Sequence, residues 1–207
     1  MTKGRRRRTV GRLASTRTVA LRRGKDREGG VQFPPLSTSL EAFLVDGSDR
    51  RFRELIYKVL STSSLMLRAR DQFAAHMGVS GPQYSMMMVI GESGAATIGQ
   101  IAEQLHVSSP FVTVEIGKLI RHDIVERRPN EVDRRSNLLA LTEHGKDLIR
   151  DVGPLRRMTN DIIFGSLSSE QAAALHDIMD RLLADSERAL YEINSPLWRK
   201  RKARTGE

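Results

Sequence analysis

The residues best suited to binding chemistry lie in the segment "NEVDRRSNLLALTEHG", residues 130–145. Two adjacent arginines, Arg134 and Arg135, follow Asp133 in a short polar stretch, and an apolar run comes after them. Arginines at the tip of a hairpin cannot help a core, but a guanidinium is suited to contact with an anion such as phosphate. An acid two positions before an arginine can hold that guanidinium in one pose. The elements around this tip indicate which anion it reaches.

The tip is predicted to join two strands. The runs "IVERR" (124–128) and "NLLAL" (137–141) are short and apolar in part, and the loop between them carries Pro129, Asn130 and Asp133. This pattern is typical of a β-hairpin. Because strand residues alternate between faces, one of the two strand arginines, Arg127 or Arg128, is expected on the same side as the tip arginines.

Two short helices are predicted directly before the hairpin, in "TIGQIAEQLHVSSPFVTVEIGKLIRHDIV". Thr97 and Gln100 fit a capping box at the start of the first helix. "HVS" is predicted to be a tight turn, and Ser109, followed by Pro110, is predicted to cap the second helix. A helix, a tight turn and a second helix of this size make a helix-turn-helix.

Longer helices are predicted on the amino-terminal side of this motif. Apolar residues recur at helical intervals from Arg50 and predict one helix of about 25 residues that ends near Gly78. The next helix is predicted to begin with Pro82 at its first position and to stop at Gly91–Gly94.

Two more helices are predicted after the hairpin. Thr142 is expected to cap the first and Ser168 the second. Pro154 is expected to kink or interrupt the first of them, because proline lacks the backbone N–H that an α-helix needs.

Composition narrows the class of protein. The chain has 207 residues, 39% hydrophobic and 29% charged, and no cysteine. The absence of cysteine excludes a disulfide scaffold, a thiol redox sensor and a cysteine-based zinc site. The sequence has no apolar run of about 18 residues and no signal-peptide pattern, so neither a membrane helix nor secretion is expected. A cytoplasmic protein is the simplest interpretation.

Positive charge is concentrated at both ends of the chain. Residues 1–30 hold 11 Lys and Arg against 2 acids, residues 196–207 hold 5 against 1, and residues 31–195 hold 18 against 22. Cationic tails are attracted to polyanions, either nucleic acid or an anionic membrane. The alternative is that the first segment, which has few apolar residues and no sustained period, is disordered and only aids solubility.

The stretch "IGQIAEQLHVSSPFVTVEIGKLIRHDIVERRPNEVDRRSNLLALTEHG" closely resembles the core of the MarR family of bacterial transcription regulators. The resemblance rests on a helix-turn-helix that is followed, at this spacing, by a DRR hairpin tip and an LTxxG helix start. It covers about residues 50–192 and is strongest at 97–145. It implies a mainly α fold with a small β-hairpin wing, which is a winged helix-turn-helix flanked by dimerisation helices.

Composition and the resemblance together predict a domain organisation. We expect a basic, disordered arm at 1–36, a MarR-type domain at 37–192 and a basic tail at 193–207. Within the domain, the DNA-binding lobe is expected at about 80–142 and the dimerisation helices at about 38–77 and 143–192.

The second helix of the motif is predicted to enter the major groove of DNA with its amino-terminal end first. Short polar side chains there can approach base edges. Ser109 is expected mainly to cap the helix, and Phe111 could face either the core or the groove. The residues expected on or near the open face are Ser108, Ser109, Phe111, Thr113, Glu115 and Lys118.

For the hairpin tip, the resemblance implies insertion into the neighbouring minor groove, whose negative potential attracts arginine. Arg135 would be the inserted residue, Asp133 its orienter and Arg134 a phosphate contact. The alternative is a solvated hairpin whose charges have no specific role.

One residue of the first long helix departs from its apolar stripe. Arg70 falls close to the centre of that stripe, and a cation there needs a partner. It could form a salt bridge to an acid of the fold or across a dimer, or it could receive an anionic ligand. The resemblance implies small aromatic acids and phenols as effectors, and Tyr84, Met87 and Met88 could line their site. The methionine cluster could equally be simple core packing.

These features predict a homodimeric, sequence-specific regulator, most simply a repressor released from a palindromic operator by a small effector such as an aromatic acid. An architectural DNA-binding protein driven by its basic tails is the alternative. An enzyme is not expected, because the five histidines form no HxxxH pair and no phosphate loop or nucleophile motif is present. No cofactor and no metal site are expected.

Overall fold

The structure is a computed structural model that describes residues 33–133 and 135–196. The chain divides into two compact units, one ending at Val59 and the other starting at Leu60. Arg134, residues 1–32 of the predicted arm and residues 197–207 of the predicted tail lie outside the described residues.

The first unit is organised by a buried carboxylate. It contains a short 3-10 helix, η1 (Glu41–Phe43), and the first turns of helix α1 (Arg50–His76). Asp49 accepts hydrogen bonds of 2.6 Å from both the backbone N–H and the hydroxyl of Ser37, and it forms an ion pair with Arg53. The Ser37 hydrogen bonds are the main cause of a lowered pKa at Asp49. These contacts fix the segment 37–49 against the start of α1.

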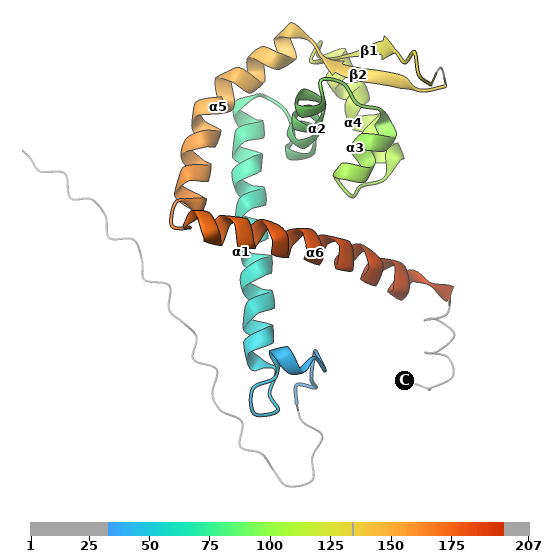
Figure 1. The fold of residues 1–207 in the computed structure, drawn as a ribbon. Helices are drawn as coiled ribbons and strands as arrows, with labels where there is room; N and C mark the ends of the chain where they lie inside the picture. Colours follow the sequence, from blue (N-terminus) through green and yellow to red (C-terminus); the bar gives the residue numbers. More distant parts are fainter. Residues whose placement is uncertain (1–32, 134, 197–207) are drawn as a thin grey trace, which may run out of the picture. The chain divides into compact units, whose positions relative to one another are not determined.

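The second unit contains the remaining helices and the hairpin (Figure 1). Figure 1 shows α2, α3, α4 and the hairpin gathered together in green and yellow. The elements are α2 (Gly81–Ser93), α3 (Ile98–Gln104), α4 (Ser109–Arg121), β1 (Val125–Pro129), β2 (Asn137–Leu141), α5 (Glu143–Phe164) and α6 (Ser169–Asn194). The predicted fold class, mainly helical with a small β-hairpin, is confirmed.

The hydrophobic core of the second unit lies among α2, α3, α4 and the hairpin. Every one of these elements contributes side chains that solvent hardly reaches: Met86, Met87, Ile90, Ile101, Val112, Ile116, Leu119, Val125 and Leu139. The end of α1 adds Phe73 and Ala74, and α5 adds Val152. This packing fixes α4 and the hairpin relative to each other.

The hairpin is antiparallel, and Val125 pairs with Leu141 and Pro129 with Asn137. A single residue before α3, Ala96, adds a third partner, because it exchanges backbone hydrogen bonds of 3.0 and 2.8 Å with Leu139. The base of the hairpin is therefore tied to the start of the helix-turn-helix, while its tip projects away from these ties.

Most predicted helix limits are confirmed. Thr97 and Gln100 form the predicted capping box, and Thr142 and Ser168 cap α5 and α6. Of the two outcomes expected at Pro154, an interruption does not occur, because α5 continues through this residue. Pro154 is exposed, so the carbonyl that loses its helical partner can bind water instead.

No helix among residues 33–133 and 135–196 is both long and apolar enough to cross a membrane.

Candidate nucleic-acid interface

Helix α4 is held by its apolar side. Val112, Ile116 and Leu119 recur at helical spacing and are almost fully buried. The turn that leads from α3 into α4 contains His106 with a φ of 52°, a left-handed conformation that reverses the chain sharply. The opposite side of α4 is left open to solvent.

The capping residue of α4 differs from the prediction. Ser108, not Ser109, is the N-cap, and its hydroxyl accepts a hydrogen bond of 3.4 Å from the backbone N–H of Phe111. Ser108 has an extended backbone, with φ −75° and ψ 143°, as an N-cap requires, whereas Ser109 is already helical. Of the two serines, Ser109 therefore has the side chain that is free of this cap.

The open side of α4 carries both polar and apolar groups. Ser109 and Thr113 are exposed, and the Thr113 hydroxyl donates to the Ser109 carbonyl at 2.9 Å. Phe111 is 39% exposed and Val114 58% exposed, so the alternative that Phe111 belongs to the core does not hold. Val114 was not expected at this surface, although its place beside Thr113 and three residues after Phe111 is a helical signal that could have identified it. Apolar side chains of this kind can contact thymine methyl groups.

Glu115 was expected near the open face, but it is buried. Its carboxylate accepts a hydrogen bond of 2.9 Å from the Gln83 side-chain amide and pairs with the Lys118 ammonium at 2.5 Å. A buried carboxylate requires such partners, and no single-helix pattern reveals that α2 supplies one. Lys118 is consequently held beside Glu115 rather than extended freely from α4.

The hairpin tip is ordered by side chain to backbone hydrogen bonds. The Asn130 side-chain oxygen accepts from the backbone N–H groups of Val132 and Asp133, both at 3.1 Å, and its amide donates to the Ser136 hydroxyl at 2.9 Å. Asparagine is favoured at such turns because its side chain can replace a backbone acceptor. The sequence analysis placed Asn130 in the loop but did not identify this role.

Asp133 contacts the backbone of Arg135. Its carboxylate accepts a hydrogen bond of 3.0 Å from the Arg135 backbone N–H. The expected contact between the Asp133 carboxylate and the Arg135 guanidinium is not among the interactions of the described residues. Asp133 thus shapes the turn that carries Arg135 and does not clamp its side chain.

A groove of about 760 Å³ lies between the helix-turn-helix and the hairpin. Its lining includes Thr113 of α4, Arg127 of β1, and Asp133 and Arg135 of the tip. Arg128 does not line it and is paired with Glu126 at 2.7 Å. The structure therefore brings Thr113, Arg127 and Arg135 to one surface and separates Arg128 from it.

The four residues expected at an effector site have different surroundings. Arg70 pairs with the neighbouring acid Asp71 at 2.9 Å. Tyr84 and Met87 are buried in the core, where the Tyr84 ring packs 5.9 Å from that of Phe73. Met88 is only partly buried, and its sulfur lies 3.0 Å from the guanidinium of Arg156. Met87 therefore packs in the core, as the alternative interpretation of the methionine cluster predicted.

Comparison with known proteins gives the surface a context. Residues 79–136 match the family model of the MarR family. The chain is 24% identical over 155 residues to YfiV, an HTH-type transcriptional regulator of Bacillus subtilis, and the match covers 73% of this chain and 95% of that protein. It is also 25% identical over 92 residues to the organic hydroperoxide resistance transcriptional regulator of Bacillus subtilis, 44% of this chain and 63% of that protein. The chain thus matches less than two thirds of the length of this second relative.

Two solved structures have a similar fold. A MarR family transcriptional regulator from Silicibacter pomeroyi superimposes with a TM-score of 0.61 at 17% identity, covering 68% of this chain and 95% of that one. A mutant MarR from E. coli, complexed with operator DNA, superimposes with a TM-score of 0.54 at 21% identity, covering 66% and 99%. At these identities the likeness establishes the winged-helix fold.

Proposed function

We propose that this chain, which belongs to the MarR family of transcription regulators and binds DNA, recognises a specific operator through α4 and the hairpin and is not an enzyme. The observation that carries the proposal is the groove in which Thr113, Arg127 and Arg135 lie together. A cation from β1, a cation from the hairpin tip and a polar group from a helix then face one surface, as a contact with a duplex requires.

The two elements have different tasks in this proposal. Helix α4 enters the major groove, where Ser109, Thr113 and the apolar side chains of Phe111 and Val114 reach base edges. The hairpin tip reaches the adjacent minor groove, and Arg135 enters it because a narrow minor groove concentrates negative potential. The mutant E. coli MarR that was solved in complex with operator DNA has a comparable fold, which supports a role in DNA binding.

We further propose that the regulator is a homodimer. Large apolar side chains stay exposed in a single chain along three helices of the second unit, which is unusual for a monomer. They are Leu60, Leu65, Met66 and Leu67 of α1, Met158, Ile162 and Phe164 of α5, and Leu175, Ile178, Leu182 and Leu190 of α6. A two-fold dimer would bury them and present two copies of α4 to half-sites about one DNA turn apart, so the operator would be a palindrome.

The regulatory role in this proposal is repression in the cytoplasm, relieved by a small effector. An effector can act only if it binds the DNA-competent and incompetent states with different affinity. The effector site expected at Arg70, Tyr84, Met87 and Met88 stays a prediction.

A direct test begins with selection of bound DNA from a random pool. Arg135→Ala should then weaken binding to the selected operator by about 1–3 kcal/mol, the scale of one good groove contact. Arg128→Ala is the matched control, because it removes the same charge from the same hairpin outside the groove. Equal losses in the two variants, or wild-type affinity in Arg135→Ala, would contradict the assignment.

The second candidate is an architectural DNA-binding protein, and the observation that favours it is the net charge of +9 in residues 1–30. Phosphate neutralisation gives affinity that depends steeply on salt and little on sequence. Removal of residues 1–30 should then flatten the salt dependence and abolish most binding. If that truncation keeps its affinity for the selected operator, the specific regulator is the better description.

A further inference from the structure

Helix α4 has an open side whose first turns are apolar. The helical repeat defines this side as the row of residues opposite Val112, Ile116 and Leu119, which are almost fully buried. The row consists of Pro110, Val114, Gly117 and Arg121. All of them except Arg121 lack a side chain that can form hydrogen bonds, so most of this row offers a partner only apolar contact.

The apolar surface extends to the residues beside this row. Phe111 is 39% exposed and Val114 is 58% exposed. Thr113 is exposed too, and its hydroxyl donates to the Ser109 carbonyl at 2.9 Å within the helix. Because a threonine hydroxyl has a single proton, Thr113 offers a partner its methyl group but no free proton in this arrangement.

Polar side chains of α4 that were expected to read bases are engaged within the protein. The Ser108 hydroxyl accepts from the Phe111 backbone N–H at 3.4 Å as the N-cap. The Glu115 carboxylate is buried, with the Gln83 amide at 2.9 Å and the Lys118 ammonium at 2.5 Å. Glu115 therefore cannot face a base, and Lys118 is held at a neighbouring carboxylate.

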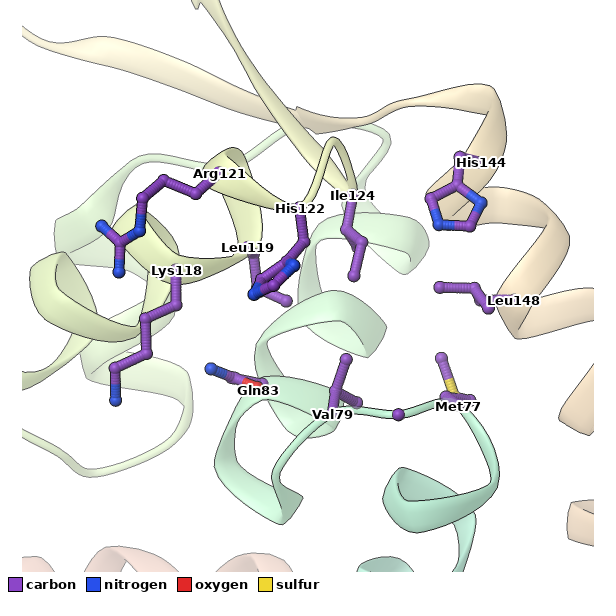
Figure 2. A pocket seen from close by; sticks show the side chains of 11 residues that line it. Met77, Val79, Gln83, Lys118, Leu119, Arg121, His122, Ile124, His144 and Leu148 are labelled. Atoms are coloured by element: carbon purple, nitrogen blue, oxygen red, sulfur yellow. The ribbon is translucent and has the colours of Figure 1, made fainter.

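The two cations of α4 lie toward its carboxyl end. Lys118 and Arg121, together with Leu119, line a cavity of about 530 Å³ behind this part of the helix (Figure 2). A helix that enters the major groove contacts base edges mainly with its amino-terminal residues. The cations are thus at the end of α4 that is farther from the bases, whereas Phe111 and Val114 are near its start.

Gly117 gives an independent indication that a partner approaches this side closely. Glycine destabilises the interior of a helix relative to alanine. Within the described residues, a methyl group added at Gly117 would meet nothing closer than the Arg121 guanidinium, at 3.8 Å. The fold itself therefore leaves room for a side chain at this position. The lack of one in the exposed row lets a partner come close to the helix backbone.

We propose that α4 reads its operator through the methyl groups of thymine, with Val114 as the residue that determines specificity and Phe111 as a second apolar contact. The proposal rests on the proposed function, since it names what the same helix recognises. Thymine displays its C5 methyl group in the major groove, where apolar side chains can contact it. The minor groove, which we assign to Arg135, displays no such methyl group, so this reading belongs to α4 alone.

The wild-type full chain and modified operators provide the first test. After the operator is selected from a random pool, each thymine of one half-site is replaced in turn by deoxyuridine, which removes the methyl group and leaves base pairing unchanged. At positions that face α4, each replacement should weaken binding about fourfold, the value of one buried carbon group. Replacement of purines by their 7-deaza forms, which removes the N7 acceptor, should have a smaller effect.

A set of variants assigns the methyl contact to Val114. Val114→Ala should weaken operator binding and should remove the difference between thymine and deoxyuridine at one position, because coupled groups do not contribute additively. Val132→Ala is the matched control, since it makes the same truncation at an exposed residue of the hairpin tip. It should keep the full response to deoxyuridine. Ser109→Ala, a truncation on α4 itself, should keep that response as well.

The proposal is overturned by a selected half-site without thymine, by an affinity that deoxyuridine does not change, or by a response to deoxyuridine that persists in Val114→Ala. A larger loss from 7-deazapurines than from deoxyuridine would also overturn it, because polar groups would then read the bases. If the pool yields no operator, the proposed function and this inference both fail. If it yields an operator whose binding does not depend on methyl groups, only the inference fails.

Discussion

The lobe that runs from α2 to β2 and the last helix, α6, differ in burial. Each element of the lobe contributes side chains to a shared core. Helix α6 spans 26 residues with an apolar side, and none of them is buried in the single chain. The lobe, together with the end of α1 and Val152 of α5, therefore forms a core within the chain, whereas α6 has an apolar side that the chain alone leaves uncovered.

This difference in burial shows what the spacing of apolar residues along a helix can predict. Apolar residues at helical spacing predict which side of a helix will be covered, and they did so for α4. They do not say whether the covering surface belongs to the same chain. For α6 we propose that a second copy supplies it, and the following predictions separate the two cases.

The largest effect, a loss of operator affinity, is expected from a substitution in α6. Leu182→Asp should convert the dimer to a monomer, because an acid in the apolar side cannot be buried without a partner. Operator affinity should then fall by about 10²- to 10⁴-fold, the usual gain from linking two binding modules. Analytical ultracentrifugation and fluorescence anisotropy measure the two changes. Arg181→Asp is the control on the polar side of the helix, and a Leu182→Asp variant that stays dimeric would refute the proposed interface.

In the lobe, Ile101→Ala should lower the free energy of unfolding by about 2–5 kcal/mol, since it leaves a cavity among tightly packed side chains. Urea denaturation provides the measurement. For comparison, Ile178→Ala of α6, made in the Leu182→Asp background, should change stability by no more than about 0.5 kcal/mol. If Ile101→Ala and Ile178→Ala lower the free energy of unfolding equally, α6 packs against a surface of its own chain. The contrast between α6 and the lobe then does not hold.

The hairpin tip is stabilised by polar contacts instead of burial, so a smaller effect is expected there. Asn130→Ala should weaken operator binding by about 1 kcal/mol, the net value of an ordinary hydrogen bond, and should leave global stability nearly unchanged. Hydrogen exchange at the Val132 and Asp133 amides should become faster, because both donate to Asn130. Glu131→Ala, which changes a neighbouring exposed residue, should alter neither operator binding nor the exchange of these amides. If the Val132 and Asp133 amides still exchange slowly in Asn130→Ala, the proposed role of Asn130 is contradicted.

The smallest effect concerns the first unit and depends on pH. The pKa of Asp49 is lowered by the Ser37 hydrogen bonds, so its stabilising contribution is complete above the pKa of the unfolded state, about 3.9. It is lost as pH falls through the folded value. Asp49→Asn should therefore loosen the segment 37–49 at neutral pH, and the difference from wild type should shrink at acidic pH. Hydrogen exchange of the Ser37 amide across this range checks the sign, and a difference that grows on acidification would exclude this explanation.

Local chemistry explains which parts of the structure were predictable. The capping box at Thr97, the cap at Thr142 and the hairpin strands depend on neighbouring residues, so the sequence determined them. The choice between Ser108 and Ser109 was missed, because both serines fit a cap locally and only the backbone of the turn decides between them.

The sequence by itself also determined the winged-helix class, the apolar side of α4 and the position of Arg135 at the hairpin tip. Only the tertiary structure decided that Glu115 is buried against Gln83, that Arg127 and not Arg128 joins the groove, and that a cavity lies behind α4. The reason is physical: hydrogen bonds between neighbours follow from residue spacing, whereas a contact between residues 83 and 115 depends on how separate helices pack.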